Sequence, residues 1–421
     1  MEFNRVSIIG SGISGISLAN ILSSYKNIKV EVFEKDSKIG GLIKCDTIDG
    51  NLFHKVGGHV FNSKNEIVLN WFWGYFNKEK EFIATDRNAK ILINNQFVGY
   101  PIENYIYQLS AVDVHDIISE LSEKFNKKND EPKDFESFLI NNFGNRLYEL
   151  YFKPYNIKIW KTDLSKIPLE WLDGKLPMPN LKTILISNVI RSKEDHMVHS
   201  KFWYPKKGGS QFIIDRLSEG LNINKKCPIN SITYLDGKLI LNDNIITDNI
   251  IYTGNVKDLF KIIEIKDQEL IRILHIVSQF ISNGTSNMLC ETDETDLSWL
   301  YIPEKSFKAH RIIYTGNFSA SNNSKTISRK TCVVEFSGKH TKDSMISELK
   351  KLPGNLKFIA YNYEQNSYVI QNSETRQIIS TLKNLLKKYN IFLHGRFAEW
   401  EYYNMDVCIE KSMELSKNFI L

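Results

Sequence analysis

The start of the chain alternates between short apolar runs and a helical pattern. Residues 6–9 form a β-branched apolar run that ends at Gly10, which predicts a buried parallel strand. Residues 12–24 then carry apolar side chains three and four positions apart, the spacing of a helix packed on one face. A second apolar run, residues 30–33, ends at Glu34. The pattern therefore predicts a strand–helix–strand unit.

The rest of the chain divides into a helical stretch and a strand-rich stretch. Residues 113–161 are mostly helical in pattern, with a polar interruption at 127–133, and residues 270–370 are typical of strands. The segment 175–199 opens with two prolines and ends in a polar run, which predicts a mobile loop. Further expected elements are helices at 64–76, 208–220, 374–388 and after Met405, a hairpin at 90–100 turning at Asn94 and Asn95, strands within 229–247, and strands at 250–252 and 391–393.

Composition narrows the class of protein without identifying it. The 421 residues are 42% hydrophobic and 24% charged, which is globular composition long enough for two or three domains. A net charge of +5 does not argue for nucleic acid; it is compatible with an anionic small substrate, although on this number alone an ordinary surface is the better explanation. The five cysteines form no CxxC pair, so we expect no disulfide framework or zinc site, and a cytoplasmic location. We expect no signal peptide and no membrane span.

The segment GSGISG lies between the first strand and the helix, in the context that a dinucleotide fingerprint requires. Gly10 permits the tight turn, Gly12 lets the backbone approach a pyrophosphate, and Gly15 lets the helix pack on the strand. The helix N-terminus adds free N–H groups for phosphates. Glu34, at the end of the second strand, can accept hydrogen bonds from ribose hydroxyls.

Two later segments favour FAD over NAD. Gly40 and Gly41 follow Glu34 closely, and a glycine pair at this place lets the chain pass near the cofactor in large FAD enzymes, although a plain turn has the same pattern. Near the C-terminus a strand ends at Gly395 and Arg396. Arg396 could serve the flavin pyrophosphate; otherwise it is a surface arginine.

The chain resembles the UDP-galactopyranose mutase family, within the wider amine-oxidase-like flavoproteins. The resemblance runs along the whole chain, and the motifs that carry it fall in the expected order. They are GSGISG, EKDSKIGG, HKVGGHVFNS (54–63), FGNRLYELYFKPYNIKIW (143–160), FWYPKKGGS (202–210), AHRII (309–313) and GRFAEWEYYNMD (395–406).

The resemblance implies an α/β fold and a mutase. It implies an FAD-binding Rossmann-like domain, a helical domain and an antiparallel-sheet substrate domain. In such enzymes N5 of reduced FAD attacks the anomeric carbon of a nucleotide-diphosphate sugar, and the sugar recloses with the other ring size, for cell-surface polysaccharide biosynthesis. NAD(P)H or another reductant primes the flavin. The protein supplies binding, orientation and electrostatics.

The expected domains are discontinuous. Residues 1–80, 200–260 and 388–421 are assigned to FAD binding, and 101–170 to the helical domain. The sheet-rich substrate domain takes 81–100, 171–199 and 261–387. A homodimer is left open.

The resemblance also implies the cofactor contacts. His59 matches a family histidine on a loop that responds to the flavin redox state; without the resemblance, a histidine flanked by glycines is a turn residue. The cofactor-binding set expected in this way is Gly10, Gly12, Ser14, Gly15, Glu34, Lys35, Gly40, Gly41, Leu42, His59, Gly395, Arg396 and Met405.

On the substrate side, Tyr155 matches the aromatic that stacks on uracil and Trp160 the tryptophan near the sugar. Both residues would otherwise be helix-packing aromatics. Arg311, Tyr368 and Tyr402 match residues that bind the diphosphate. The substrate-binding set is Tyr155, Trp160, Lys175, Arg311, Tyr368 and Tyr402, and the catalytic set is His59, Lys175 and Arg311.

Lys175 departs from the family pattern, which has an arginine in the aligned stretch. The charge is kept, but the planar bidentate fork of a guanidinium is lost. This difference could change the substrate, the rate or the placement of the diphosphate. Alternatively, Lys175 is solvated and a more distant arginine such as Arg191 takes the role.

Two other functions compete with the mutase. An FAD-dependent amine oxidase or desaturase would consume O2 or another acceptor stoichiometrically, whereas a mutase needs reductant only to prime the flavin. A flavin-binding assembly factor would turn over no nucleotide sugar. The joint presence of Arg311, Tyr368 and Tyr402 favours the mutase.

Overall fold

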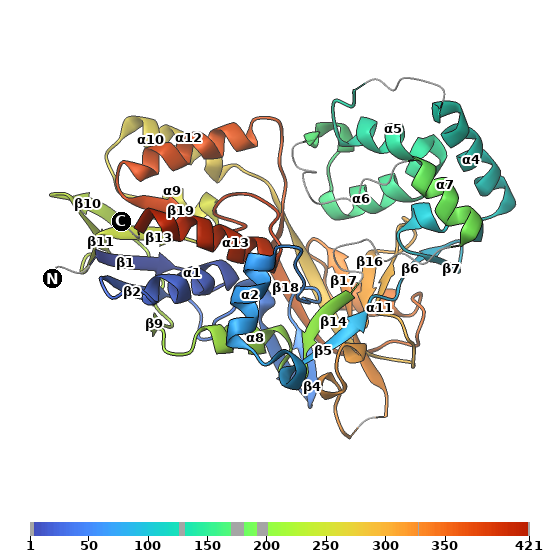
Figure 1. The fold of residues 1–421 in the computed structure, drawn as a ribbon, viewed down its shortest axis with the longest axis horizontal. Helices are drawn as coiled ribbons and strands as arrows, with labels where there is room; N and C mark the ends of the chain where they lie inside the picture. Colours follow the sequence, from blue (N-terminus) through green and yellow to red (C-terminus); the bar gives the residue numbers. More distant parts are fainter. Residues whose placement is uncertain (1–3, 126–130, 170–180, 192–200, 327, 420–421) are drawn as a thin grey trace.

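The chain forms three groups of elements around two large sheets. The computed structural model describes residues 4–125, 131–169, 181–191, 201–326 and 328–419. Figure 1 shows the first and last parts of the chain together at one end, and helices α4–α7 together at the other. No helix in these ranges is long and apolar enough to cross a bilayer.

A parallel sheet holds the strand–helix–strand unit predicted at the start of the chain. Its central strand β1 lies between β2 and β13, so side chains on both faces are covered, as the apolar runs predicted. Along β13, Ile250 and Tyr252 pack into one core cluster, whereas Ile251 packs into another. The order is β19 (Ile391–Leu393), β13 (Asn249–Tyr252), β1 (Asn4–Ile9), β2 (Ile28–Phe33) and β9 (Ile223–Asn224).

Helices cover both faces of this sheet. One face packs against α1 (Ile13–Ser23), α2 (Glu66–Tyr75), α8 (Gly209–Leu217) and α13 (Met405–Ser416). The other face packs against α9 (Leu259–Ile262), α10 (Gln268–Ser278) and α12 (Thr375–Lys387), and against a small antiparallel sheet of β10 (Ile232–Leu235), β11 (Lys238–Leu241) and β12 (Ile245–Thr247). Helices α10 and α12 thus pack on the parallel sheet, although they come from the range 261–387.

A seven-stranded, mainly antiparallel sheet forms the second layer. One face packs against α11 (Lys342–Leu349), and the other faces the helical group. The strand order is β18 (Lys357–Val369), β14 (Ser282–Thr292), β17 (Lys330–Ser337), β16 (Ala309–Ile313), β15 (Trp299–Tyr301), β6 (Ala89–Ile93) and β7 (Gln96–Gly99). Strand β15 pairs in parallel with β6, and this joins the hairpin β6–β7 to the sheet.

The helical group consists of α4 (Ala111–Phe125), α5 (Phe135–Leu147), a π-helical turn over Tyr148–Phe152, α6 (Lys153–Trp160) and α7 (Leu181–Ile190). Lys158 fastens α6 to the sheet, because its Nζ donates to the carbonyls of Ile302 (2.8 Å), Glu304 (2.6 Å) and Ala309 (3.2 Å). These carbonyls flank the connection between β15 and β16, so α6 is held directly over the strand that carries Arg311.

The α/β fold class predicted from the sequence is confirmed, and most elements lie where they were expected. The hairpin turns at Asn94 (φ 49°) and Asn95 (φ 60°), the backbone that a tight hairpin requires. Two expectations were wrong. Leu181–Ile190 is a helix inside the predicted loop, whose remainder lies outside the described residues. The stretch 270–370, expected to be strand-rich, begins with the amphipathic helix α10 over 268–278 and also contains the helix α11 over 342–349. Elements that were not predicted include α3 (Lys78–Glu81), α9 and β9. They also include the strand pairs β3 (Cys45–Ile48) with β4 (Asn51–His54) and β5 (Phe82–Asp86) with β8 (Lys201–Pro205).

Candidate active site

One cavity of about 580 Å³ begins at the carboxyl ends of β1, β2 and β13 and reaches the seven-stranded sheet. This is the edge of an open α/β sheet where ligands bind. The cavity brings together residues from segments far apart in the sequence. The predicted site residues that line it are Gly10, Gly12, Ser14, Glu34, Lys35, Gly40, Gly41, Leu42, His59, Arg311, Tyr368, Arg396, Tyr402 and Met405.

Glycines shape the nucleotide end of the cavity. Gly10 has φ +107°, and a Cβ on Gly15 would lie 2.1 Å from the Gly10 carbonyl oxygen, so the helix packs directly on the turn. Gly41 has φ +54°, and a Cβ on it would lie 3.1 Å from the Cα of Gly12. The two glycine segments therefore touch through their backbones, which leaves the N-terminus of α1 open to the cavity.

Glu34 is 5% exposed and holds the glycine turn from the end of β2. Its carboxylate accepts hydrogen bonds from the Ser11 amide (3.1 Å), from the Ser11 hydroxyl and from the Asp36 amide (2.9 Å). A carboxylate has about four acceptor positions, so a further donor such as a ribose hydroxyl can still be accepted.

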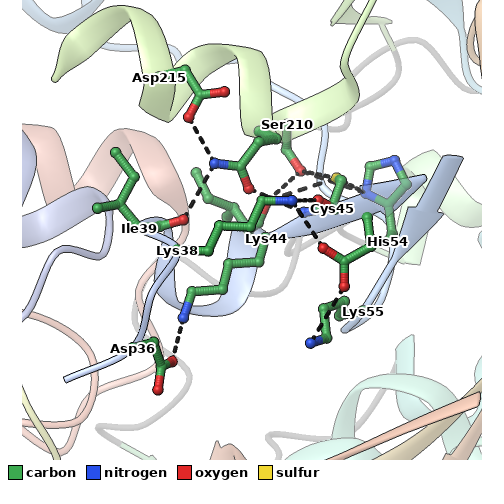
Figure 2. A network of polar contacts seen from close by, with 12 residues as sticks. Asp36, Lys38, Ile39, Lys44, Cys45, His54, Lys55, Ser210 and Asp215 are labelled. Atoms are coloured by element: carbon green, nitrogen blue, oxygen red, sulfur yellow. Dashed lines mark hydrogen bonds and ion pairs between the residues drawn. The ribbon is translucent and has the colours of Figure 1, made fainter. Parts of the chain in front are cut away.

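A polar network fastens the second glycine segment to helix α8 and strand β3 (Figure 2). The amide of Gln211 donates to the Ile39 carbonyl (3.2 Å) and to Asp215 (2.8 Å), and its oxygen accepts from the Cys45 amide (3.2 Å). Lys44 pairs with Asp36 at 2.5 Å. Because these contacts flank Gly40 and Gly41, they fix the backbone that passes the cavity.

The buried Cys45–His54 contact in the same network is structural. Cys45 Sγ lies 3.5 Å from His54 Nδ1, and burial raises the pKa of the thiol, so the thiolate is disfavoured. Burial also lowers the pKa of His54 to about 3, and its Nε2 lies 2.6 Å from the Tyr204 hydroxyl. All five cysteines lie in the described residues and are free, and no cluster of potential metal ligands occurs in those residues.

The C-terminal segment returns to the same cavity. Gly395 has φ +95°, and a Cβ there would lie 2.5 Å from Ser14 Oγ at the start of α1. Arg396 donates to the Ser367 carbonyl, and its guanidinium lies 3.9 Å from the centroid of the Tyr402 ring. Its Nε is buried without a partner among the described residues. Gly395 and Gly15 do not line the cavity; they bring its walls together.

His59 also lines the cavity. Burial lowers its pKa to about 4, helped by the positive charges of Arg396 and Arg311 and opposed by Glu335. The imidazole is therefore neutral at pH 7. In the described part of the chain its Nε2 has no hydrogen-bond partner.

Arg311 and Glu335 form a buried ion pair at the far end. They lie opposite each other on β16 and β17, and Arg311 Nε donates to Glu335 Oε2 at 2.5 Å. Burial would raise the pKa of Glu335, but Arg311 and His310 hold it well below its usual range. The Tyr368 hydroxyl accepts from Arg311 Nη2 (3.3 Å) and donates to Glu335 Oε1 (3.4 Å). Glu335 thus orients both groups.

Aromatic rings wall this end. The rings of Tyr368 and Tyr402 are parallel, 6.0 Å apart, and the edge of Trp160 meets both, at 5.4 and 6.1 Å. Tyr155 stacks on Tyr151 and meets Tyr301 edge-on at 5.5 Å. Trp160 and Tyr155 therefore back the cavity walls and do not line the cavity themselves.

Several cavity residues were not predicted from the sequence. Among them are Trp299, Tyr301 and Glu335, which lie on the strands beside Arg311, and Arg87, which lies in the link between β5 and β6. Glu335 could have been found only from the pairing of β16 with β17. Lys175 lies outside the described residues. Arg191, the alternative cation, lies on the surface 5.3 Å from the Tyr107 ring and does not line the cavity.

Comparison with known proteins agrees with the fold and the motifs. Residues 8–76 match the family model of an NAD(P)-binding Rossmann-like domain. The chain is 23% identical to the UDP-galactopyranose mutase of Mycoplasma genitalium, over 98% of this chain and 94% of that protein. It is 29% identical to the dTDP-fucopyranose mutase of Escherichia coli, over 42% of this chain and 46% of that protein.

The fold also matches solved structures. A crystal structure of reduced UDP-galactopyranose mutase superposes with a TM-score of 0.88 at 19% identity, over 99% of this chain and 95% of that one. The resemblance to the UDP-galactopyranose mutase family predicted from the motifs is confirmed by these matches.

Proposed function

We propose that this chain, a relative of the UDP-galactopyranose mutases, is a flavin-dependent isomerase that interconverts the pyranose and furanose forms of a nucleotide-diphosphate sugar. The observation that carries the proposal is the continuity of the cavity. Its nucleotide end is formed by Gly12 and Glu34, and its far end by Arg311, Tyr368 and Tyr402. A dinucleotide cofactor and an anionic substrate can thus meet in one site.

The residues fit FAD better than NAD. A second glycine segment, at Gly41, and a C-terminal segment, at Arg396, extend the nucleotide end well beyond the first strand–helix–strand unit. The buried, unpartnered Nε of Arg396 suits a phosphate oxygen, and the amino end of α13 near Met405 adds a partial positive charge. Reduced FAD would supply a nucleophilic nitrogen, N5, for the anomeric carbon, after priming by NAD(P)H or another reductant.

The chain itself would bind the diphosphate and stabilise it as it departs. Glu335 fixes the Arg311 guanidinium, so the N–H groups that these contacts leave over are held in place to donate to phosphate oxygens. The Tyr368 hydroxyl can donate to a phosphate oxygen in place of its long contact with Glu335 (3.4 Å). Preorganised donors of this kind stabilise developing negative charge without having to reorient. Neutral His59 can exchange a hydrogen bond with a ligand without adding charge. Trp160 keeps the two tyrosines in position.

The second candidate is an amine oxidase or desaturase on the same fold. It would have little use for a guanidinium and two phenols gathered at one end of the cavity. The relatives include mutases that their names assign to different sugars and bases. The direct test is therefore to reduce the FAD-loaded enzyme and incubate it with a panel of UDP-, dTDP- and GDP-sugars. Furanose products would support the mutase, whereas stoichiometric O2 consumption without them would support the oxidoreductase.

A further inference from the structure

Arg87 is a second arginine at the Arg311 end of the cavity. It stands between β5 and β6 and lines the cavity. Its Nη2 donates to the hydroxyl of Tyr301, and its guanidinium carbon lies 4.9 Å from the Tyr100 ring centroid and 5.0 Å from that of Trp299. Tyr301 pairs with Arg311 across β15 and β16. Tyr301 is thus the hydrogen-bond partner of Arg87 and the cross-strand neighbour of Arg311.

The two arginines differ in how their charges are compensated. Arg311 is paired with the buried carboxylate of Glu335. Within the described ranges, Arg87 has no carboxylate at ion-pair distance; its one hydrogen bond goes to a neutral phenol, and its Nε is buried without an acceptor. A buried N–H on a cation without an acceptor is costly, so an acceptor from a ligand would be favoured here.

The surroundings of Arg87 determine which ligand fits. Aromatic rings beside a guanidinium stabilise the cation and leave its N–H groups free to donate within the guanidinium plane. Two N–H groups in one plane match the spacing of two oxygens on a carboxylate or a phosphate. Neutral hydroxyls of a plain sugar would satisfy such a fork less well.

We propose that Arg87 is a specificity residue that binds an oxyanion of the nucleotide sugar. This inference rests on the proposed function. The oxyanion has two sources, the diphosphate or a carboxylate on the sugar, and both would reach Arg87 from the cavity beside Arg311. In either case, Arg87 and Arg311 together would favour a more negatively charged substrate than Arg311 alone would.

Binding to the FAD-loaded protein tests the proposal without requiring turnover. The probes are UDP, UDP-galactose and UDP-glucuronate, with dTDP as a second base, measured by calorimetry. The variants are Arg87→Met, which keeps the bulk and removes the charge, and Arg87→Lys, which keeps the charge and removes the fork. Lys90→Met is the matched control, because Lys90 also lies near an aromatic ring, Tyr105 at 5.9 Å, but does not line the cavity.

If Arg87 binds the diphosphate, Arg87→Met should weaken UDP, dTDP and both UDP-sugars alike, by roughly 10- to 100-fold, and Arg87→Lys by less. If it binds a sugar carboxylate, only UDP-glucuronate should lose that affinity. Lys90→Met should change none of them. Unchanged affinities in both Arg87 variants, with flavin content and melting temperature intact, would overturn the inference and leave the proposed function standing. If Arg87→Met does not fold, Arg87→Lys decides by the same comparison. Failure of the wild type to bind any probe would instead remove the proposed function, and the inference with it.

Discussion

Replacing Arg311 by alanine should destabilise the fold as well as the substrate site, and the loss should depend on pH. Glu335 is 1% exposed, so removal of its partner leaves a buried carboxylate without a counter-charge. Breaking a buried ion pair in this way costs about 3–5 kcal/mol. The Glu335 carboxyl group can avoid being buried as an anion by taking up a proton. Protonation costs about 1.4 kcal/mol for each pH unit by which the solution pH exceeds the ordinary pKa of ~4.3, or about 4 kcal/mol at pH 7.

The pH dependence separates the variant from the wild type. In the wild type the pKa of Glu335 is depressed, so the stability that it contributes is present above its unfolded-state pKa and is lost as the pH falls through the folded pKa. In Arg311→Ala we expect that pKa to rise above neutrality, so the variant gains stability as the pH is lowered. The difference between the two proteins should shrink from about 4 kcal/mol at pH 7 to about 1 kcal/mol at pH 5.

Urea-induced unfolding of the FAD-loaded proteins at pH 5, 6 and 7 measures this difference. Glu335→Gln in the Arg311→Ala background is the control: it should recover most of the loss and abolish the extra pH dependence, because no buried charge remains. Equal unfolding free energies for Arg311→Ala and the wild type at all three pH values would refute the idea that Arg311 and Glu335 form a buried ion pair.

Three further predictions concern the cofactor, the substrate and acid stability. Gly41→Ala should fold but lose FAD, because its φ of +54° and the nearby glycine turn leave no room for a methyl group. The control Gly220→Ala, with φ +78° and open space around it, should keep its FAD and stay yellow. Flavin absorbance after gel filtration measures the FAD content of both variants. Tyr402→Phe should keep its FAD and lose roughly three- to tenfold in kcat/KM, because one hydrogen bond from a phenol contributes about 0.5–1.5 kcal/mol. An unchanged kcat/KM would show that the Tyr402 hydroxyl does not contact the substrate. Burial lowers the pKa of His394 to about 4, so near pH 6.5 the unfolded chain takes up a proton at this residue and the native chain does not. The free energy of unfolding should therefore fall by up to about 3 kcal/mol between pH 6.5 and 4. In urea titrations, His394→Gln should make that fall smaller.

The glycine turn at the start of the chain and its flanking elements could be predicted from the sequence because their signals are local. Gly10, Gly12 and Gly15 share one turn, and the apolar runs on either side determine the strands and the helix. Helix α10 was missed although its apolar positions have helical spacing, because it lies among strands in the sequence. Helix α7 was missed because prolines and a polar run flank it.

The far end of the cavity, around Arg311, depends on strand pairing that the sequence does not display. Glu335 becomes the partner of Arg311 only through the register of β16 with β17, and Tyr301 reaches the same place through β15. Arg87 comes from a short link more than 200 residues away in sequence from Tyr301. Motif resemblance identified Arg311, but not the carboxylate that holds it or the second arginine beside it.

In the proposed function, one cavity holds reduced FAD and a nucleotide-diphosphate sugar, and the size of the sugar ring changes there. The most direct measurement is chromatography of UDP-, dTDP- and GDP-sugars incubated with the FAD-loaded enzyme before and after dithionite reduction. We predict a furanose product from at least one sugar, formed only by the reduced enzyme and over many turnovers for each flavin. No ring isomer from any sugar, with stoichiometric consumption of O2 and an amine or lipid substrate instead, would contradict the account.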